Sequence, residues 1–189
     1  NSNRLRNLKK SVMRMLQVAS NPRIINDPEF QELLKSQGLF QLVEEASPKF
    51  IEVCKLARSI AEKGEKVIIW SGFRENIKLL ESDLADLNPV VVDGSVPSSS
   101  DETEIGTREY NINKFKSDST CKVFIANPAA ASEGISLHID HDKNRLCSNA
   151  IYMDRNFNAA QFIQSVDRIH RLGMIGIAKI FVFKTTNSM

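Results

Sequence analysis

The ten residues QSVDRIHRLG, from Gln164 to Gly173, place two arginines three positions apart, with a glutamine four positions before the first. At 100° per residue in a helix, Gln164, Arg168 and Arg171 lie within about 60° of one another. Guanidinium groups carry fork-shaped donors that match phosphate oxygens, so two such groups on one face could stabilise the charge of a transferring phosphoryl group. Polar helix faces are more often simply solvated, so the pattern taken alone leaves both interpretations open.

Apolar residues at the same spacing predict how this segment is anchored. Phe162, Val166 and Ile169 fall on the opposite face from the arginines, which predicts an amphipathic helix over residues 159–172. His170 falls on a different face from the arginines, where a structural hydrogen bond is expected rather than catalysis.

Composition narrows the class of protein. The chain has 189 residues with 42% hydrophobic content, enough for one domain with a core and an appended helical piece. A formal charge of +2 favours no partner, but the first 14 residues carry five basic and no acidic side chains. That cluster fits either contact with nucleic acid or a solvated helix face.

The cysteines, histidines and apolar runs argue against a disulfide-rich protein, a metal centre and a membrane protein. Three widely spaced cysteines form no disulfide framework, so a reducing compartment is expected. His138, His141 and Cys147 lack a clear fourth ligand, and no metal centre is predicted. Without an apolar run of membrane-spanning length or a signal-peptide core, no membrane association is expected and the chain is interpreted as soluble and intracellular.

The hydrophobic pattern changes after Gly64. Helical spacing predicts helices at 3–19, 28–36 and 47–62. Beyond them, short β-branched runs alternate with helical patterns, which predicts βαβ units around a parallel sheet. The strands are expected at 66–70, 89–93, 122–127, 150–154 and 178–183, and the helices at 75–87, 108–115 and 159–172. We therefore expect a helical segment over 1–63 and an α/β domain over 64–189.

Four loops that follow predicted strands carry small polar residues. They span 70–75, 93–95, 126–138 and 153–173. Because ligands bind beyond the carboxyl ends of parallel strands, we expect all four on one edge of the sheet. Several of their residues are suited to neutral hydrogen bonds with phosphate oxygens, although each alone is an ordinary loop residue: Ser71, Gly94, Ser95, Asn127 and Ser132.

The order and spacing of these segments resemble the C-terminal motor lobe of superfamily-two helicases, most closely the Swi/Snf-type DNA translocases. The resemblance covers almost the whole chain, including MRMLQVASNPRII and SPKF near the N-terminus. Its strongest part is the closing motif. The matching residues are Ser71-Gly72-Phe73, Asp93-Gly94-Ser95, Arg108 and Phe115, Gly134-Ile135-Ser136-Leu137, and then Asp154, Phe157, Asn158, Gln164, Asp167, Arg168, His170, Arg171 and Gly173.

The resemblance implies a RecA-like fold and specific roles for site residues. Arg168 and Arg171 resemble the arginine fingers of the family, aligned by Gln164. Asp167 either pairs with a nearby arginine or is solvated. In the family the Glu133-Gly134 pair lies nearest the nucleotide. The residues that resemble its DNA contacts are Ser71, Phe73, Gly94, Ser95, Asn127 and Ser132.

Two motifs that bind ATP and Mg²⁺ in such motors are absent from the sequence. The sequence contains neither a GxxxxGK[ST] loop nor a DExH or DEAD tetrad. ATP and Mg²⁺ would therefore be bound mainly by the N-terminal RecA-like lobe of the same protein, and the chain alone is predicted not to hydrolyse ATP.

The function that the sequence favours is the C-terminal motor lobe of an ATP-dependent translocase on double-stranded DNA. One alternative is the lobe of an RNA helicase or strand-separating motor, and another is a non-catalytic DNA-binding or scaffold module. The expected location is the nucleus for a eukaryotic protein, and the cytoplasm or nucleoid for a bacterial one.

Overall fold

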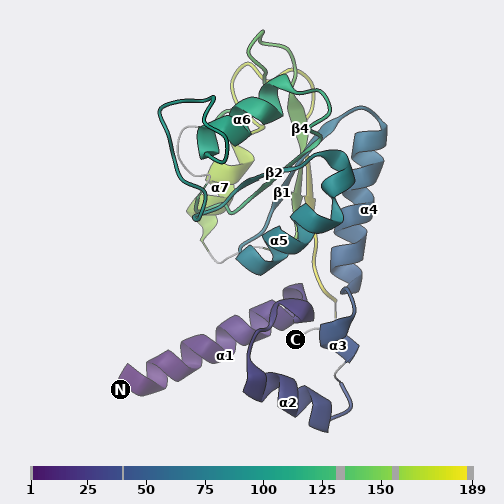
Figure 1. Ribbon diagram of the computed structural model, residues 1–189, viewed down its shortest axis with the longest axis vertical. Coiled ribbons are helices and arrows are strands. Elements are labelled where there is room, and N and C mark those ends of the chain that lie inside the picture. The colour runs from purple at the N-terminus through teal and green to yellow at the C-terminus, as the bar shows by residue number, and fades with distance from the viewer. Residues whose placement is uncertain (1, 40, 131–134, 155–157, 187–189) are drawn as a thin grey trace. The chain divides into compact units, whose positions relative to one another are not determined.

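The computed structural model describes residues 2–39, 41–130, 135–154 and 158–186 (Figure 1). It contains two compact units, which we describe separately. The first comprises Asn1–Glu52 with Lys184–Met189, and the second comprises Val53–Phe183.

The first unit is helical, and local side-chain caps set its helix starts. Asp27 accepts a hydrogen bond from Phe30 N (3.1 Å), and Ser47 accepts one from Phe50 N (3.2 Å); a proline follows each cap, where a missing N–H does no harm. The predicted helices at 3–19, 28–36 and 47–62 are confirmed to within one residue. Two shorter elements were not predicted. The elements are α1 (Ser2–Ser20), η1 (Pro22–Ile24), α2 (Pro28–Ser36), α3 (Gln41–Glu44) and α4 (Pro48–Glu62).

The second unit is built on a five-stranded sheet in the order β2-β3-β1-β4-β5, with every neighbouring pair parallel. The strands are β1 (Lys66–Trp70), β2 (Val90–Val92), β3 (Val123–Ala126), β4 (Cys147–Tyr152) and β5 (Lys179–Val182). Between them lie α5 (Arg74–Asp83), η2 (Ala85–Leu87), α6 (Arg108–Ser117) and α7 (Ala159–Val166). This parallel sheet flanked by helices confirms the predicted RecA-like α/β fold.

Alternation along the strands divides the core into two layers. Ile68 and Trp70 of β1 belong to a cluster that includes Phe115 of α6 and is lined by Phe162 of α7. Helices α4 and α5 lie on the other side of the sheet in Figure 1, and they contribute further buried residues: Val53, Ala57, Ile60, Ile77 and Leu80. Each strand face is thus covered, as parallel sheets require.

Trp70 closes the central strand and has no accessible surface. Its ring stacks near Tyr152 of β4, with 6.3 Å between the ring centroids. Among the described residues, its indole Nε1 has no hydrogen-bond partner. The Tyr152 hydroxyl, in contrast, lies 2.7 Å from Ser165 Oγ of α7.

Three predicted elements differ from the observed ones by three or more residues. The helix predicted over 75–87 ends at Asp83, where α5 is followed by the separate turn η2. Strand β4 begins at Cys147, three residues early, because Asn149 is paired inside the sheet by Glu65 Oε2 (2.7 Å) and the Lys66 carbonyl (3.1 Å). Helix α7 ends at Val166, so the prediction of a continuous helix over 159–172 was wrong. Among the described residues, no helix is long and apolar enough to cross a bilayer.

Candidate functional site

The candidate site lies along the edge of the sheet where its strands end. Asp93 follows β2, Asn127 follows β3, Ser71 follows β1 and Asp154 comes two residues after β4. Because all these strands are parallel, the loops after them share one edge, as predicted. We call this edge, with Ser71–Arg74, Asp93–Ser95, Asn127 and Asp154, the rim.

Asp154 organises the centre of the rim. One carboxylate oxygen accepts hydrogen bonds from Ser71 Oγ (2.7 Å) and Asn76 Nδ2 (3.2 Å), and the other accepts from Gly72 N. A Cβ atom at Gly72 would lie 3.1 Å from Asp154 Oδ1, so the close approach of the two loops favours glycine there. Ser71, a predicted DNA contact, is fully buried with its hydroxyl in this network. It therefore positions the loop after β1.

A second carboxylate joins the neighbouring loops. Asp93 accepts hydrogen bonds from Ser95 N (2.8 Å) and Ser95 Oγ (2.6 Å), and forms an ion pair with Arg74 Nε at 3.0 Å. Burial raises the pKa of Asp93, but the bonds from Ser95 and Arg74 outweigh it and leave the pKa below its ordinary value. Asp93 is buried, whereas Gly94 and Ser95 are exposed and about half of the Arg74 side chain is accessible, at 51%.

Asn127 links the third loop to the rim. Its Nδ2 donates to the Gly72 carbonyl (3.2 Å), and its Oδ1 accepts from Ala129 N (2.8 Å). Asn127 and Phe73 are half-buried. The remaining predictions in this loop, Ser132, Glu133 and Gly134, lie outside the described residues.

Arg168 does not project from a helix face as the spacing predicted. After Val166 the backbone continues in tighter turns, with Arg168 N bonded to Ser165 O (3.3 Å) and Ile169 N to Val166 O (3.1 Å). The Arg168 side chain is only 7% exposed, and its Nη1 donates to the Ile135 carbonyl at 3.0 Å. Leu137 N donates back to the Arg168 carbonyl, also at 3.0 Å. Two hydrogen bonds therefore tie Arg168 to residues 135–137, in the loop after β3.

Burial and nearby charges both act on the pKa of Arg168. Burial lowers its pKa first, and the charge of Arg171 lowers it further; Asp167 acts in the opposite direction and Arg108 in the same direction as Arg171. Gln164, Asp167 and Arg171 are exposed. Two arginine charges and one carboxylate charge therefore act on a buried guanidinium.

Arg171 begins a tight turn. Met174 N donates to the Arg171 carbonyl at 3.0 Å, and Gly173 has φ of +87°. This left-handed conformation is disfavoured for residues with a Cβ atom, which explains the glycine of the motif. Arg171 is thus held at the start of a defined turn, although its side chain is exposed.

His138 lies beside the arginines and is 6% exposed, with Nδ1 2.9 Å from Ser136 Oγ. Burial lowers the pKa of His138, and the charges of Arg171 and Lys116 lower it further. The His138 imidazole is therefore neutral in the folded protein at pH values at which the same imidazole in the unfolded chain already binds a proton.

This shift predicts a pH dependence of stability. The pKa of His138 is lower in the folded state than in the unfolded chain. The contribution of His138 to the free energy of unfolding is therefore complete above the pKa of the unfolded chain, about 6.5, and is lost as pH falls through the pKa of the folded state. From about pH 7.5 to about pH 5.5, wild type should lose more unfolding free energy than His138→Asn, which keeps a polar group near Ser136. The exposed His170, changed to Asn, is the matched control. Parallel urea stability curves for wild type and His138→Asn would contradict the expectation.

The residues weighed as metal ligands have other partners. His141 Nε2 lies 2.9 Å from Asn113 Oδ1, and Cys147 Sγ donates to the Lys66 carbonyl at 3.3 Å. Burial raises the pKa of Cys147 to about 12, so its thiol stays protonated. In the described ranges, no three His, Cys, Asp or Glu side chains are grouped to hold a metal ion.

Sequence reasoning missed two basic residues of the site. Arg108 was noted only as part of a motif, yet its charge acts on Arg168. Arg74 was not considered, although it pairs with Asp93 on the rim. Both arginines could have been found from their position, because Arg74 is the first residue of α5 and Arg108 the first residue of α6, each after a loop that follows a predicted strand.

Comparisons with known proteins identify the family of the chain. The model of the helicase conserved C-terminal domain family matches residues 48–173. ATP-dependent helicase FUN30 of Saccharomyces cerevisiae is 31% identical over 147 residues, which are 76% of this chain and 12% of that protein. Lymphoid-specific helicase of Homo sapiens is 26% identical over 193 residues, 97% of this chain and 20% of that protein. CHD3-type chromatin-remodeling factor CHR7 of Arabidopsis thaliana is 25% identical over 175 residues, 90% of this chain and 13% of that protein.

A solved structure supports the same relationship. The C-terminal part of the Fun30 ATPase domain matches with a TM-score of 0.61 and 26% identity, covering 87% of this chain and 52% of that one. The chain spans a fifth or less of the length of the curated relatives named above. It belongs to the helicase conserved C-terminal domain family, as a RecA-like C-terminal lobe of the Swi/Snf type.

Proposed function

We propose that this chain is the C-terminal motor lobe of an ATP-dependent translocase on double-stranded DNA, and that it supplies Arg168 and Arg171 to ATP bound by the N-terminal lobe. The observation that carries the proposal is the arginine cluster. Arg168 is buried and fixed to the Ile135 carbonyl, and the charges of Arg171 and Arg108 act on it together with that of Asp167. A γ-phosphate arriving from a second lobe would be attracted by these arginines, most of all when charge spreads over its oxygens in the transition state.

Fixing the Arg168 guanidinium matters for the chemistry. A donor that is already oriented loses little freedom when the transition state forms, so its electrostatic effect is larger than that of a mobile side chain. The exposed Arg171 would complete the pair from the adjacent turn, and Gln164 would contact the nucleotide beside them. ATP with Mg²⁺ would bind mainly to the N-terminal lobe.

The link between Arg168 and residues 135–137 suggests how DNA binding and ATP hydrolysis communicate. The preceding loop contains Ser132, Glu133 and Gly134, for which we propose contacts with the DNA backbone and the nucleotide. A shift of that loop would be transmitted to Arg168 through its bonds with Ile135 and Leu137. DNA contact would then set the position of an arginine finger.

For the DNA track we propose the exposed part of the rim. Ser95, the backbone at Gly94, Asn127 and the ring of Phe73 are accessible or half-buried. Arg74 adds a partly exposed positive charge. Polar and charged groups of this kind can contact a phosphate backbone without distinguishing its sequence. The names of the relatives favour this role over a scaffold module, and a nuclear location follows if the protein acts on chromatin as CHR7 is named to do.

The proposal predicts a division of activity between fragment and longer protein. A longer protein with both lobes should hydrolyse ATP with stimulation by duplex DNA, whereas this 189-residue chain should show no turnover above background. A phosphate-release assay with and without duplex DNA measures both. DNA-stimulated turnover by the chain alone, or stimulation by single-stranded RNA and not by duplex DNA, would overturn the proposal.

A further inference from the structure

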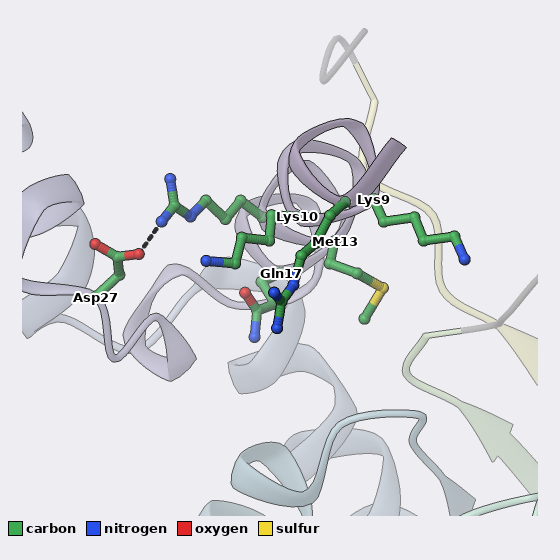
Figure 2. A pocket seen from close by; sticks show the side chains of 7 residues that line it. Lys9, Lys10, Met13, Gln17 and Asp27 are labelled. Carbon is green, nitrogen blue, oxygen red and sulfur yellow. Dashed lines mark hydrogen bonds and ion pairs between the residues drawn. The ribbon is translucent and has the colours of Figure 1, made fainter. Parts of the chain in front are cut away.

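Helix α1 presents a basic groove that lies outside the unit bearing the arginines and the rim. A cavity of about 390 Å³ is lined by one face of α1 and by the residue that caps α2. Figure 2 shows Lys10 extending from α1 toward the side on which Asp27 lies, and Lys9 and Met13 extending to the opposite side. We call it the basic groove; its residues are Arg6, Lys9, Lys10, Met13, Arg14, Gln17 and Asp27.

One wall of the basic groove is fixed by an ion pair. Arg14 is bonded to Asp27, whose other carboxylate oxygen caps α2 by accepting from Phe30 N. That backbone bond lowers the pKa of Asp27 against the effect of burial, and Arg14 lowers it further. Asp27 therefore stays anionic and neutralises Arg14 alone. Among the described residues, Arg6, Lys9 and Lys10 form no ion pair.

The basic groove faces away from the apolar side of α1. At 100° per residue, its helix residues centre about 150° from Leu5, Leu8, Val12 and Met15. Leu5 and Leu8 are 59% and 61% exposed, so the apolar side is open to packing. Arg6, Lys9 and Lys10 are exposed.

We infer that the basic groove is a docking surface for the phosphodiester backbone of duplex DNA. The inner N–H groups of a helix are bonded within it, so this face offers side-chain cations and little else. A phosphodiester backbone needs only such charged donors. An acidic peptide would also bring backbone amide groups that need hydrogen-bond partners. Among the uncharged residues on this face, only Gln17 could form such a hydrogen bond. The inference does not rest on the proposed function.

The test is fluorescence anisotropy of the 189-residue protein with a labelled duplex of arbitrary sequence, at several salt concentrations. In the variant, Arg6, Lys9 and Lys10 are all changed to Gln, which favours helix and removes three charges. The slope of log affinity against log salt should become shallower by about 2.7, or about 0.9 for each phosphate that these side chains no longer neutralise. The control changes the exposed Lys55, Lys63 and Lys143 to Gln, which also removes three charges and should leave the slope at the wild-type value.

Two further arms keep the outcome decisive. Labelled polyglutamate of matched charge should bind wild type at least about tenfold more weakly than the duplex at equal salt; equal binding would assign the groove to acidic peptides and overturn the inference. An unchanged slope in the triple variant with helical circular dichroism intact, or equal changes in variant and control, would also overturn it. The variant Arg74→Gln tests the rim separately. If the slope of log affinity against log salt for this variant equals the wild-type slope, the result counts against DNA binding by the rim. It does not affect the result for the basic groove.

Discussion

Replacing Arg171 by Ala in the longer protein that contains this lobe should lower DNA-stimulated ATP turnover about 10³-fold at saturating ATP. The loss reflects the charge that an arginine finger supplies to the γ-phosphate in the transition state. Arg171 is exposed at the start of a turn, so the fold should be unaffected. Measuring ATP turnover by phosphate release and following unfolding in parallel separates an effect on catalysis from an effect on stability.

Matched variants sharpen this expectation. Arg171→Lys keeps the charge but loses the planar fork, and should recover only part of the turnover. Lys179→Ala removes an exposed positive charge elsewhere and should leave turnover within about twofold of wild type. Wild-type turnover in Arg171→Ala would remove this residue from the nucleotide site.

Arg168 requires a different variant because of where it lies. Arg168→Ala would leave the Ile135 carbonyl without its donor in a buried place, so a loss of turnover would be mixed with a loss of stability. The spacing placed both arginines on the face of a helix opposite its apolar residues, but in the structure Arg168 is buried. Arg168→Lys, compared with wild type at equal folded fraction, is the cleaner test of its role.

Replacing Asp154 by Ala should lower the free energy of unfolding of Val53–Phe183 by roughly 3 kcal/mol. The carboxylate accepts from Ser71 Oγ, Gly72 N and Asn76 Nδ2, and both Ser71 and Asn76 are fully buried. Removing an ionised acceptor leaves these donors desolvated, which costs more than an exposed hydrogen bond is worth. Urea unfolding followed by circular dichroism gives the value.

The control for this variant is Asp142→Ala, an exposed carboxylate in the loop before β4. It should change the unfolding free energy by less than about 0.5 kcal/mol. Asp154→Asn keeps one acceptor and should fall between the two. If Asp154→Ala unfolded at the wild-type urea concentration, the network would be incidental to the rim.

The fold was predictable because its signals are local. The β-branched run at 66–70 coincides with β1, and the caps at Asp27 and Ser47 mark the starts of α2 and α4. The shared edge of the four loops followed from parallel pairing alone. These features depend on neighbouring residues or on a rule of sheet geometry, so one sequence was enough.

The site was less predictable because its contacts join distant parts of the chain. Ser71 was expected to face a phosphate, but its hydroxyl is bonded to a carboxylate 83 positions away. Helical spacing was extended to residue 172, yet the backbone leaves the helix after Val166, where Arg168 bonds to residues 135 and 137. Periodicity does not show when a tertiary hydrogen bond outweighs one more helical turn.

The buried indole of Trp70 gives the protein a built-in optical reporter. It is the only tryptophan in the chain, and it belongs to the sheet-containing unit. Its apolar surroundings should give a blue-shifted emission that moves to longer wavelength when that unit opens to water. The helical unit of residues 1–52 has no tryptophan and is silent in this signal, although it contributes to the circular dichroism. Comparing the two signals during unfolding would show whether the expected segments 1–63 and 64–189 melt together or in separate steps.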